Sequence, residues 1–380
     1  MSPQLQATLT VIRDALLHDQ PTERDQSAAL ERQLAGLTVS VAGETFALND
    51  PRLRENSRIW AEIVRGNIDY KRRYELTTQL TYLPPDVAAV LVEHFGRTDL
   101  LNLKKVTSIS PASAERLARL EGDRLVLGLT TLDARTAELL AQMKVSSLCL
   151  HLTSLNANIA EKLAQSNSWA LSLPDLPSLD AEAAEKLAQR KGNELKLDGL
   201  TSLNARTAGK LAQWQGNFLS LRGLTSLDAE TAEMLSQWQG NYLYLDGLTS
   251  LSPETAEKIA QWRGIGLSLN GLRSLSPESA EKLAQWRRTD LSINGLRSLY
   301  QKTVSIITGR RGTHLDLNGL SSLDAETAKR LAQWSGVEMN LRGISTIDAA
   351  TEKQLVRFSG EIYLAHVSKQ ISSSFKHYGS

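Results

Sequence analysis

Residues 196–203 read KLDGLTSL, and nearly the same letters return as SLRGLTSL at 220–227 and as YLDGLTSL at 244–251. The phrase recurs every 24 residues, and further copies follow at the same spacing. A fixed period of roughly 20–50 residues is typical of solenoids, in which each repeat packs only against its neighbours. The sequence therefore predicts a solenoid, a fold that presents extended surfaces.

Each repeat unit begins with a predicted strand. Leu195 and Leu197 alternate with polar residues, which indicates a short strand with one face in the core. Asp198 and Gly199 form a turn dipeptide, because glycine tolerates the positive φ angle that ends a strand sharply. Leu200 then continues the apolar pattern into the connecting loop.

The second half of each unit predicts a short helix. Ala208, Leu211 and Ala212 fall at positions i, i+3 and i+4, so they form one apolar stripe. A helix-capping residue precedes the stripe, and we expect Gly216 to end the helix. The capping residues in successive units are Asp180, Asn204, Asp228, Ser252, Ser276 and Asp324. Proline follows the cap at Pro253 and Pro277, where a helix accepts it best.

This unit predicts a curved molecule. Strands joined through helices in one sheet run parallel. Neighbouring strands lie about 4.8 Å apart, whereas packed helices need roughly 8–10 Å. The difference in spacing should curve the stack, with strands on the concave side and helices on the convex side.

The Leu-X-Leu strand, the period of 23–24 residues and the helical return resemble leucine-rich repeats. The sequence is similar to a divergent, bacterial-style subclass: the family's usual asparagine is replaced by Leu200 and Leu224, and a usual leucine by Gly216 and Gly240. The resemblance implies an α/β solenoid, a leucine-rich-repeat horseshoe with parallel strands on the concave face. It also implies a protein-interaction scaffold, and it brings no catalytic residues.

The repeat divides the chain into three parts. Residues 76–366 hold about 12 repeats, whereas residues 1–75 and the tail 367–380 do not fit the period. Because the ends of a solenoid expose apolar faces, we expect residues 1–75 to form a mostly helical cap. Within that segment the sequence predicts a hairpin around Gly43 over residues 38–48, and helices over 3–18, 21–34 and 56–74.

Composition restricts the classes of function. Lys+Arg 43 against Asp+Glu 42 leaves a net charge of +1, which argues against nucleic-acid binding or an anionic membrane. The single cysteine, Cys149, fits a reducing compartment. The N-terminus lacks the pattern of a secretory signal, and no apolar run approaches a membrane span. We therefore expect a cytoplasmic protein without a cofactor, and export by a signal-independent route is left open.

Alternation along the strands indicates which residues face away from the core. In three adjacent units these outward positions carry aromatic and charged side chains, the usual composition of binding hot spots. We therefore predict a partner-binding site at Glu194, Lys196, Phe218, Arg222, Tyr242, Tyr244 and Asp246. The other interpretation is that the aromatic residues simply pack across neighbouring strands.

Three further columns have a structural and a functional interpretation. Asp198, Asp246, Asn270, Asn294 and Asn318 precede glycine and are interpreted as turn residues rather than calcium ligands. Trp214, Trp238, Trp262, Trp286 and Trp334 are expected to close the core rather than to form an exposed ladder. Cys149 and His151 lie two apart on one strand, where we expect a small exposed thiol rather than a nucleophile pair.

Arginine residues gather on one edge of the later repeats. They are Arg263, Arg287, Arg288, Arg310 and Arg311, and they form a secondary basic patch that suits phosphate or carboxylate groups. Three functional hypotheses follow. The first is a non-enzymatic scaffold or adaptor that binds another protein on the concave face. The alternatives are an effector-like protein with an activity or assembly function in residues 1–75, and an anion or nucleic-acid binder that uses the arginine edge.

Overall fold

The computed structural model describes residues 38–47, 50–65, 69–94, 100–286, 288, 290–299, 301–308 and 313–364. The helices predicted over 3–18 and 21–34 and the tail 367–380 lie outside these residues. The chain divides into two compact units. The first holds Met1–Thr153 and Gln165–Leu171, and the second holds Ser154–Ala164 and Ser172–Ser380. Each unit is described on its own below.

In the described residues twelve parallel strands alternate with helices, which confirms the predicted α/β solenoid. Strands β3 to β14 follow one another through a 12-stranded sheet in chain order. Each pairing within a unit joins equivalent residues of consecutive repeats, so Leu195 pairs with Leu219 and Leu219 with Leu243. The strand leucines found from the sequence therefore define the register.

The first unit begins with a two-stranded antiparallel hairpin, β1 (Thr38–Val41) and β2 (Glu44–Ala47). Ala42 and Gly43 have φ angles of 52° and 82° at its turn, as the predicted hairpin around Gly43 requires. The helix expected over 56–74 is instead two helices, the second capped by Asp69. The remaining elements of this unit are α3 (Pro51–Arg65), α4 (Tyr70–Gln79), α5 (Pro85–His94), β3 (Leu100–Leu103), α6 (Pro111–Leu117), β4 (Glu121–Leu127), α7 (Ala134–Ala141) and β5 (Lys144–Leu150).

An aromatic cluster connects the hairpin to the helices that follow it. The Trp60 ring lies 5.7 Å from Phe46 and 6.4 Å from Tyr82, measured between centroids. Trp60 Nε1 donates a hydrogen bond to the Tyr82 carbonyl at 3.1 Å, and Tyr82 Oη donates to Glu44 at 2.7 Å. Burial and this carboxylate raise the pKa of Tyr82, so its hydroxyl stays protonated as a donor. The hairpin therefore packs against α3 and the residues after α4 through this aromatic cluster.

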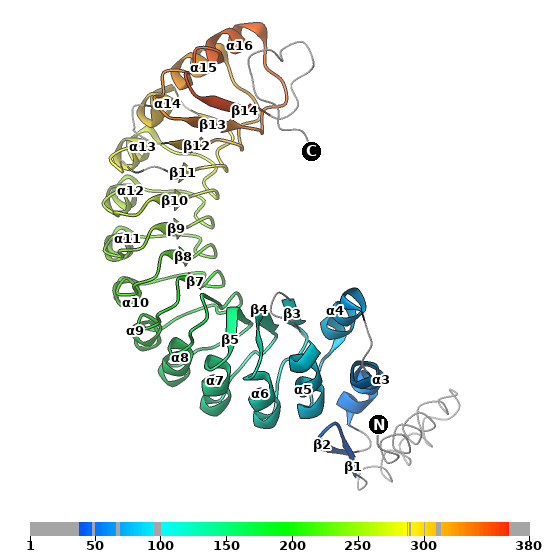
Figure 1. The fold of residues 1–380 in the computed structure, drawn as a ribbon. Helices are drawn as coiled ribbons and strands as arrows, with labels where there is room; N and C mark the ends of the chain where they lie inside the picture. Colours follow the sequence, from blue (N-terminus) through cyan, green and yellow to red (C-terminus); the bar gives the residue numbers. More distant parts are fainter. Residues whose placement is uncertain are drawn as a thin grey trace, which may run out of the picture. The chain divides into compact units, whose positions relative to one another are not determined.

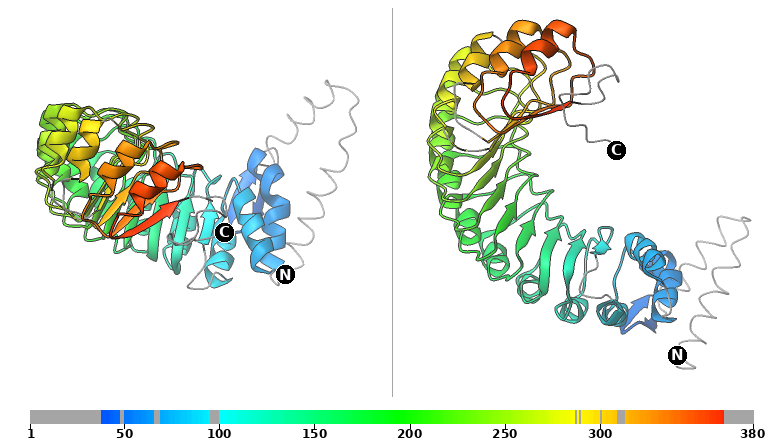
Figure 2. Two further views of the ribbon diagram at one scale, coloured as in Figure 1. Left: turned by 90° about the horizontal axis from the view of Figure 1, so that it is seen from above. Right: turned by 45° about the horizontal axis from the view of Figure 1, so that its top comes forward.

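The second unit repeats strand and helix with little variation (Figure 1). Within this unit the strands line the inner side of an arc and the helices its outer side, as Figure 1 and the right view of Figure 2 show. Strand β6 (Ala170–Ser172) lies at the division between the units. The unit contains α8 (Ala157–Ala164), α9 (Ala181–Leu187), β7 (Glu194–Lys196), α10 (Ala205–Leu211), β8 (Phe218–Ser220), α11 (Ala229–Ser236), β9 (Tyr242–Tyr244), α12 (Pro253–Ile259), β10 (Gly266–Ser268), α13 (Pro277–Leu283), β11 (Asp290–Ser292), α14 (Gln301–Thr308), β12 (His314–Asp316), α15 (Ala325–Leu331), β13 (Glu338–Leu341), α16 (Ala349–Leu355) and β14 (Glu361–Leu364).

The helices begin where their capping residues predict. The side chain of Asn204 accepts a hydrogen bond from the backbone N–H of Thr207 at 2.9 Å, which satisfies an otherwise unpaired donor of the first turn. The same bond forms at the other predicted caps, and Pro253 and Pro277 occupy the first helical position. In α10, Ala208 and Leu211 are fully buried, so the apolar stripe forms the helix side of the core.

The tryptophan column is part of the core, which confirms its structural interpretation. Trp214, Trp238, Trp262 and Trp286 stack in succession with centroids 5.8–6.1 Å apart and planes within 3° of parallel. Trp238 and Trp262 also donate Nε1–H to the backbone carbonyl of the preceding tryptophan at 3.0 Å. One repeat earlier in the column stands Arg190, which is 2% exposed and whose burial lowers the pKa of its guanidinium to about 10.

Two columns of glycine have a different role from the one expected. Among the described residues only Gly43 is a glycine with positive φ, so Gly199 does not end its strand through such a conformation. A Cβ atom on Gly199 would instead lie 2.5 Å from the Pro174 carbonyl oxygen, because successive loops pack too closely for a side chain. Helix α10 ends at Leu211, before Gly216, where a Cβ would lie 2.0 Å from the Trp214 ring. Gly216 therefore makes room for the indole rather than stopping the helix.

Candidate functional site

Phe218, Tyr242 and Tyr244, hereafter the aromatic trio, lie on adjacent strands of the second unit. The rings of Phe218 and Tyr242 stack with centroids 4.9 Å apart and planes within 4°. Tyr242 also covers Gly266, where an added Cβ would lie 2.5 Å from the Tyr242 ring. All three side chains are half-buried, so the rings pack across the strands and still present apolar area to solvent. Burial raises the pKa of the Tyr244 hydroxyl.

Arg222 connects the trio to a carboxylate. Its guanidinium carbon lies 4.6 Å from the centroid of the Tyr244 ring, and its Nε donates to Asp246 Oδ2 at 2.8 Å. The other carboxylate oxygen of Asp246 accepts from Ser268 Oγ and from the Asn270 backbone N–H. Asp246 is therefore a fixed acceptor that holds Arg222 against the Tyr244 ring, and the arginine is ordered before any partner arrives.

Glu194 and Lys196 lie two residues apart on β7, and their side chains pair with each other. Lys196 Nζ lies 3.1 Å from Glu194 Oε1. The register places Glu194 beside Phe218, so this ion pair borders the aromatic trio. The seven residues predicted as a partner-binding site thus form one contiguous surface over β7 to β9, which we call the strand-face site. The charged side chains of this site pair with one another, Glu194 with Lys196 and Arg222 with Asp246.

The Asp and Asn column before the glycines is a structural ladder. Asp198 Oδ1 accepts the backbone N–H of Arg222 at 3.1 Å, and Asp246, Asn270, Asn294 and Asn318 each accept the corresponding N–H one repeat later at 2.8–3.1 Å. Serine side chains add to it, since Ser292 Oγ donates to Asn270 at 2.8 Å. These oxygens hold consecutive loops together. Within the described ranges, no group of three or more His, Cys, Asp or Glu side chains is arranged to hold a metal.

Cys149 and His151 do not form an exposed pair. Cys149 is 4% exposed and His151 is 8% exposed, so the expectation of an exposed thiol is wrong. The register puts Cys149 beside Val126 on β4, which is itself 7% exposed.

The arginine edge is described only in part. Arg263 and Arg288 are exposed, whereas Arg287, Arg310 and Arg311 lie outside the described residues. The secondary basic patch therefore stays a prediction.

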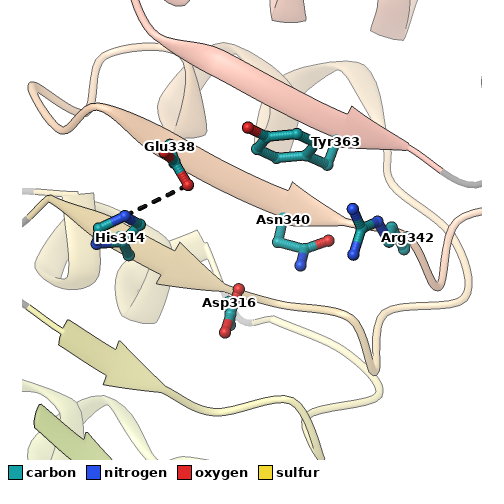
Figure 3. Close-up of a pocket in the computed structure, with 6 residues that line it drawn as sticks. All are labelled: His314, Asp316, Glu338, Asn340, Arg342 and Tyr363. Carbon is teal, nitrogen blue, oxygen red and sulfur yellow. Dashed lines mark ion pairs between the residues drawn. The ribbon is translucent and has the colours of Figure 1, made fainter. Parts of the chain in front are cut away.

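A second feature of the strand face was not singled out from the sequence. A pocket of about 360 Å³ opens over β12, β13 and β14 in the second unit, lined by His314, Asp316, Glu338, Asn340, Arg342 and Tyr363 (Figure 3). His314 Nε2 lies 3.3 Å from Glu338 Oε2, and the Arg342 guanidinium carbon lies 5.3 Å from the Tyr363 ring centroid. The sequence did contain one signal of this pocket. Asp316 and Asn340 stand at a strand position that is serine in three earlier repeats, namely Ser220, Ser268 and Ser292.

No protein-family model matches the sequence, and no curated protein matches it. Several solved structures are similar in fold. A leucine-rich-repeat protein of Leptospira interrogans is 20% identical, with 82% of this chain and 80% of that chain covered and a TM-score of 0.42. A chain of the TLR13–ssRNA13 complex is 16% identical and covers 75% of this chain, with a TM-score of 0.47.

A chain of the Toll–Spatzle complex of Drosophila is 12% identical and covers 73% of this chain, with a TM-score of 0.46. This chain spans 44% of the TLR13 and Toll chains that it matches. The 24-residue strand–helix unit and the parallel sheet give this chain the fold of leucine-rich repeat proteins. Among the residues that the structure describes, no helix is long and apolar enough to cross a bilayer.

Proposed function

We propose that this protein is a non-enzymatic scaffold that binds a partner protein through the strand-face site. The observation that carries the proposal is the aromatic trio, with its half-buried rings on three neighbouring positions of the sheet surface. Large aromatic side chains and arginine dominate the binding energy of protein interfaces. Protein is the partner class that such a surface fits best, because its charges compensate one another and leave no field for nucleic acid.

The site is ordered before binding, which favours affinity. The stack fixes Phe218 and Tyr242, and Asp246 with the Tyr244 ring fixes Arg222. Immobilising a flexible side chain at an interface costs about 0.5–1.5 kcal/mol. These side chains are already ordered in the free protein, so binding loses little of this free energy. Parallel strands joined by their backbone hydrogen bonds support all of these side chains, so the surface keeps its shape.

Residues 1–75 are proposed to act as a cap. Their described part holds the hairpin and the Trp60 cluster, which close an apolar core at the start of the solenoid. Residues 38–75 contain no Cys or His, and this favours a cap over the effector-like alternative. A turnover assay on the intact chain tests the choice, and substrate turnover would favour the alternative.

Replacing Arg222 with glutamate is expected to weaken partner binding by roughly tenfold or more. The substitution removes the cation that lies over Tyr244 and places a second carboxylate beside Asp246. The measurement is the affinity for the protein captured with the intact chain from host lysate. Arg273→Glu makes the same change of charge at an exposed position outside the strand-face site and serves as the control. Equal affinities of both variants would remove Arg222 from the site.

A further inference from the structure

The pocket over β12, β13 and β14 carries acceptors at strand positions where three earlier repeats carry a serine donor. In three repeats a serine on the strand face donates its hydroxyl hydrogen to the Asp or Asn of the preceding loop, as Ser220, Ser268 and Ser292 do. Asp316 and Asn340 occupy the next two positions of that column. Neither has a hydroxyl to donate, so both depart from the bonding pattern of the repeat.

The departure leaves two acceptors without donors. Within the described residues, the partly buried Asp316 carboxylate has no hydrogen-bond donor and no ion-pair partner. Asn340 Oδ1 is buried and also lacks a hydrogen-bond partner there. A partly desolvated carboxylate without a counter-charge costs free energy, which an incoming cation that donates hydrogen bonds would offset.

The charges around the pocket favour a cation over an anion. Asp316 and Glu338 line it, and Asp290 and Glu361 stand beside it on the flanking strands. Three of these carboxylates already have polar partners: Thr313 Oγ1 donates to Asp290 at 3.1 Å, His314 Nε2 lies 3.3 Å from Glu338 Oε2, and Tyr363 Oη donates to Glu361 at 2.8 Å.

The single permanent positive charge, Arg342, lies at the exposed rim against the Tyr363 ring, where solvent screens it. Figure 3 shows Asp316 on the side of the pocket away from Tyr363. An anion would sit between the Asp316 and Glu338 carboxylates, whereas a cation at Asp316 gains an ion pair.

We infer that this pocket binds a basic side chain, the guanidinium or ammonium group of an arginine or lysine, carried by a protein partner. The group would donate to Asp316, with Glu338 as the next acceptor. A pocket of about 360 Å³ lies at the small end of ligand sites, which suits one side chain rather than an extended cofactor. The inference does not depend on the strand-face site, which lies on other strands.

A titration followed by NMR tests the inference on the full chain. The chain carries 6 histidines, and His314 lines the pocket, so ¹³C label at the histidine Cε1 places a probe at the site. His314→Gln identifies its signal. The probe molecule is N-acetyl-arginine methylamide, and its neutral counterpart with citrulline and its acidic counterpart with glutamate are compared. We expect the His314 signal to shift saturably with the arginine compound and to shift little with the other two.

Asp316→Ser is the decisive variant, because it restores the residue that the repeat uses elsewhere. We expect a thermal unfolding midpoint at least equal to that of the parent chain, and binding of the arginine compound weakened by about tenfold. Asp316→Asn is the second variant if the serine variant does not fold. Glu278→Gln removes one exposed carboxylate from α13 and should bind as the parent does. Equal binding by the Asp316 variants, no saturable shift, or saturable binding of the glutamate compound would each overturn the inference.

Discussion

Replacing Trp262 with alanine is expected to lower the free energy of unfolding by about 4 kcal/mol. The indole is 1% exposed and lies between the Trp238 and Trp286 rings, at centroid distances of 5.8 and 6.1 Å. Its loss would leave a cavity between two repeats and remove the hydrogen bond to the Trp238 carbonyl. A solenoid is stabilised through contacts between neighbouring repeats, so the loss of this indole weakens the packing of one repeat against the next.

Denaturation by guanidinium chloride, followed by circular dichroism, measures this effect. Trp262→Phe is the matched variant, since Phe358 already stacks on Trp334 at 5.9 Å in the same column. The phenylalanine variant should lose only about 1–2 kcal/mol, because it keeps a ring in the stack and loses the N–H donor. Equal losses for alanine and phenylalanine would show that the stack contributes little.

Replacing Gly247 with alanine is expected to destabilise the fold by about 3 kcal/mol, although it adds only one methyl group. The new Cβ would lie 2.3 Å from the Arg222 carbonyl oxygen and 2.5 Å from that of Leu224. Both atoms belong to the backbone of the preceding repeat, so no side-chain rotation relieves the clash and the loops must separate. The ion pair between Arg222 and Asp246 joins the same two loops and would be strained with them.

Gly209→Ala adds the same methyl group, but here we expect it to leave the stability of the fold equal or higher. Gly209 lies within helix α10, and its added Cβ would meet only the flexible Met234 side chain, at 3.4 Å. Alanine in a helix interior is more favourable than glycine by roughly 1 kcal/mol. Thermal unfolding of both variants is therefore expected to show a lower midpoint for the Gly247 variant and an equal or higher one for the Gly209 variant. A neutral Gly247 variant would contradict the close loop packing.

Much of the fold follows from features that are local in the sequence. The alternation around Leu195 and Leu197 gives strand and register, and Asn204 with its equivalents gives the helix starts, because each depends on a few neighbouring residues. The roles predicted for the recurrent glycines were wrong. The sequence shows that Gly199 recurs, but the carbonyl that crowds it belongs to the preceding repeat, and only the stacked structure brings the two together.

The sequence predicted where the candidate site lies, but it did not predict which contacts connect its side chains. Alternation placed the aromatic trio on one surface, yet the Phe218–Tyr242 stack and the ion pair between Arg222 and Asp246 depend on side-chain rotamers on two neighbouring strands and the loops that follow them. The pocket at Asp316 was missed for a related reason. Its signal is an interruption of a serine column, which acquires meaning only once the hydroxyl of serine is seen to donate to the loop ladder.

Affinity capture from host lysate, read out by mass spectrometry, tests whether the aromatic trio forms a protein-binding surface. The intact chain is compared with a variant in which Phe218, Tyr242 and Tyr244 are all alanine. The control carries alanine at Gln213, Gln237 and Gln261, which are exposed in the same three repeats and lie outside the strand-face site. We expect the intact chain and the control to capture a protein that the folded aromatic variant does not capture. Equal capture by all three chains would contradict it.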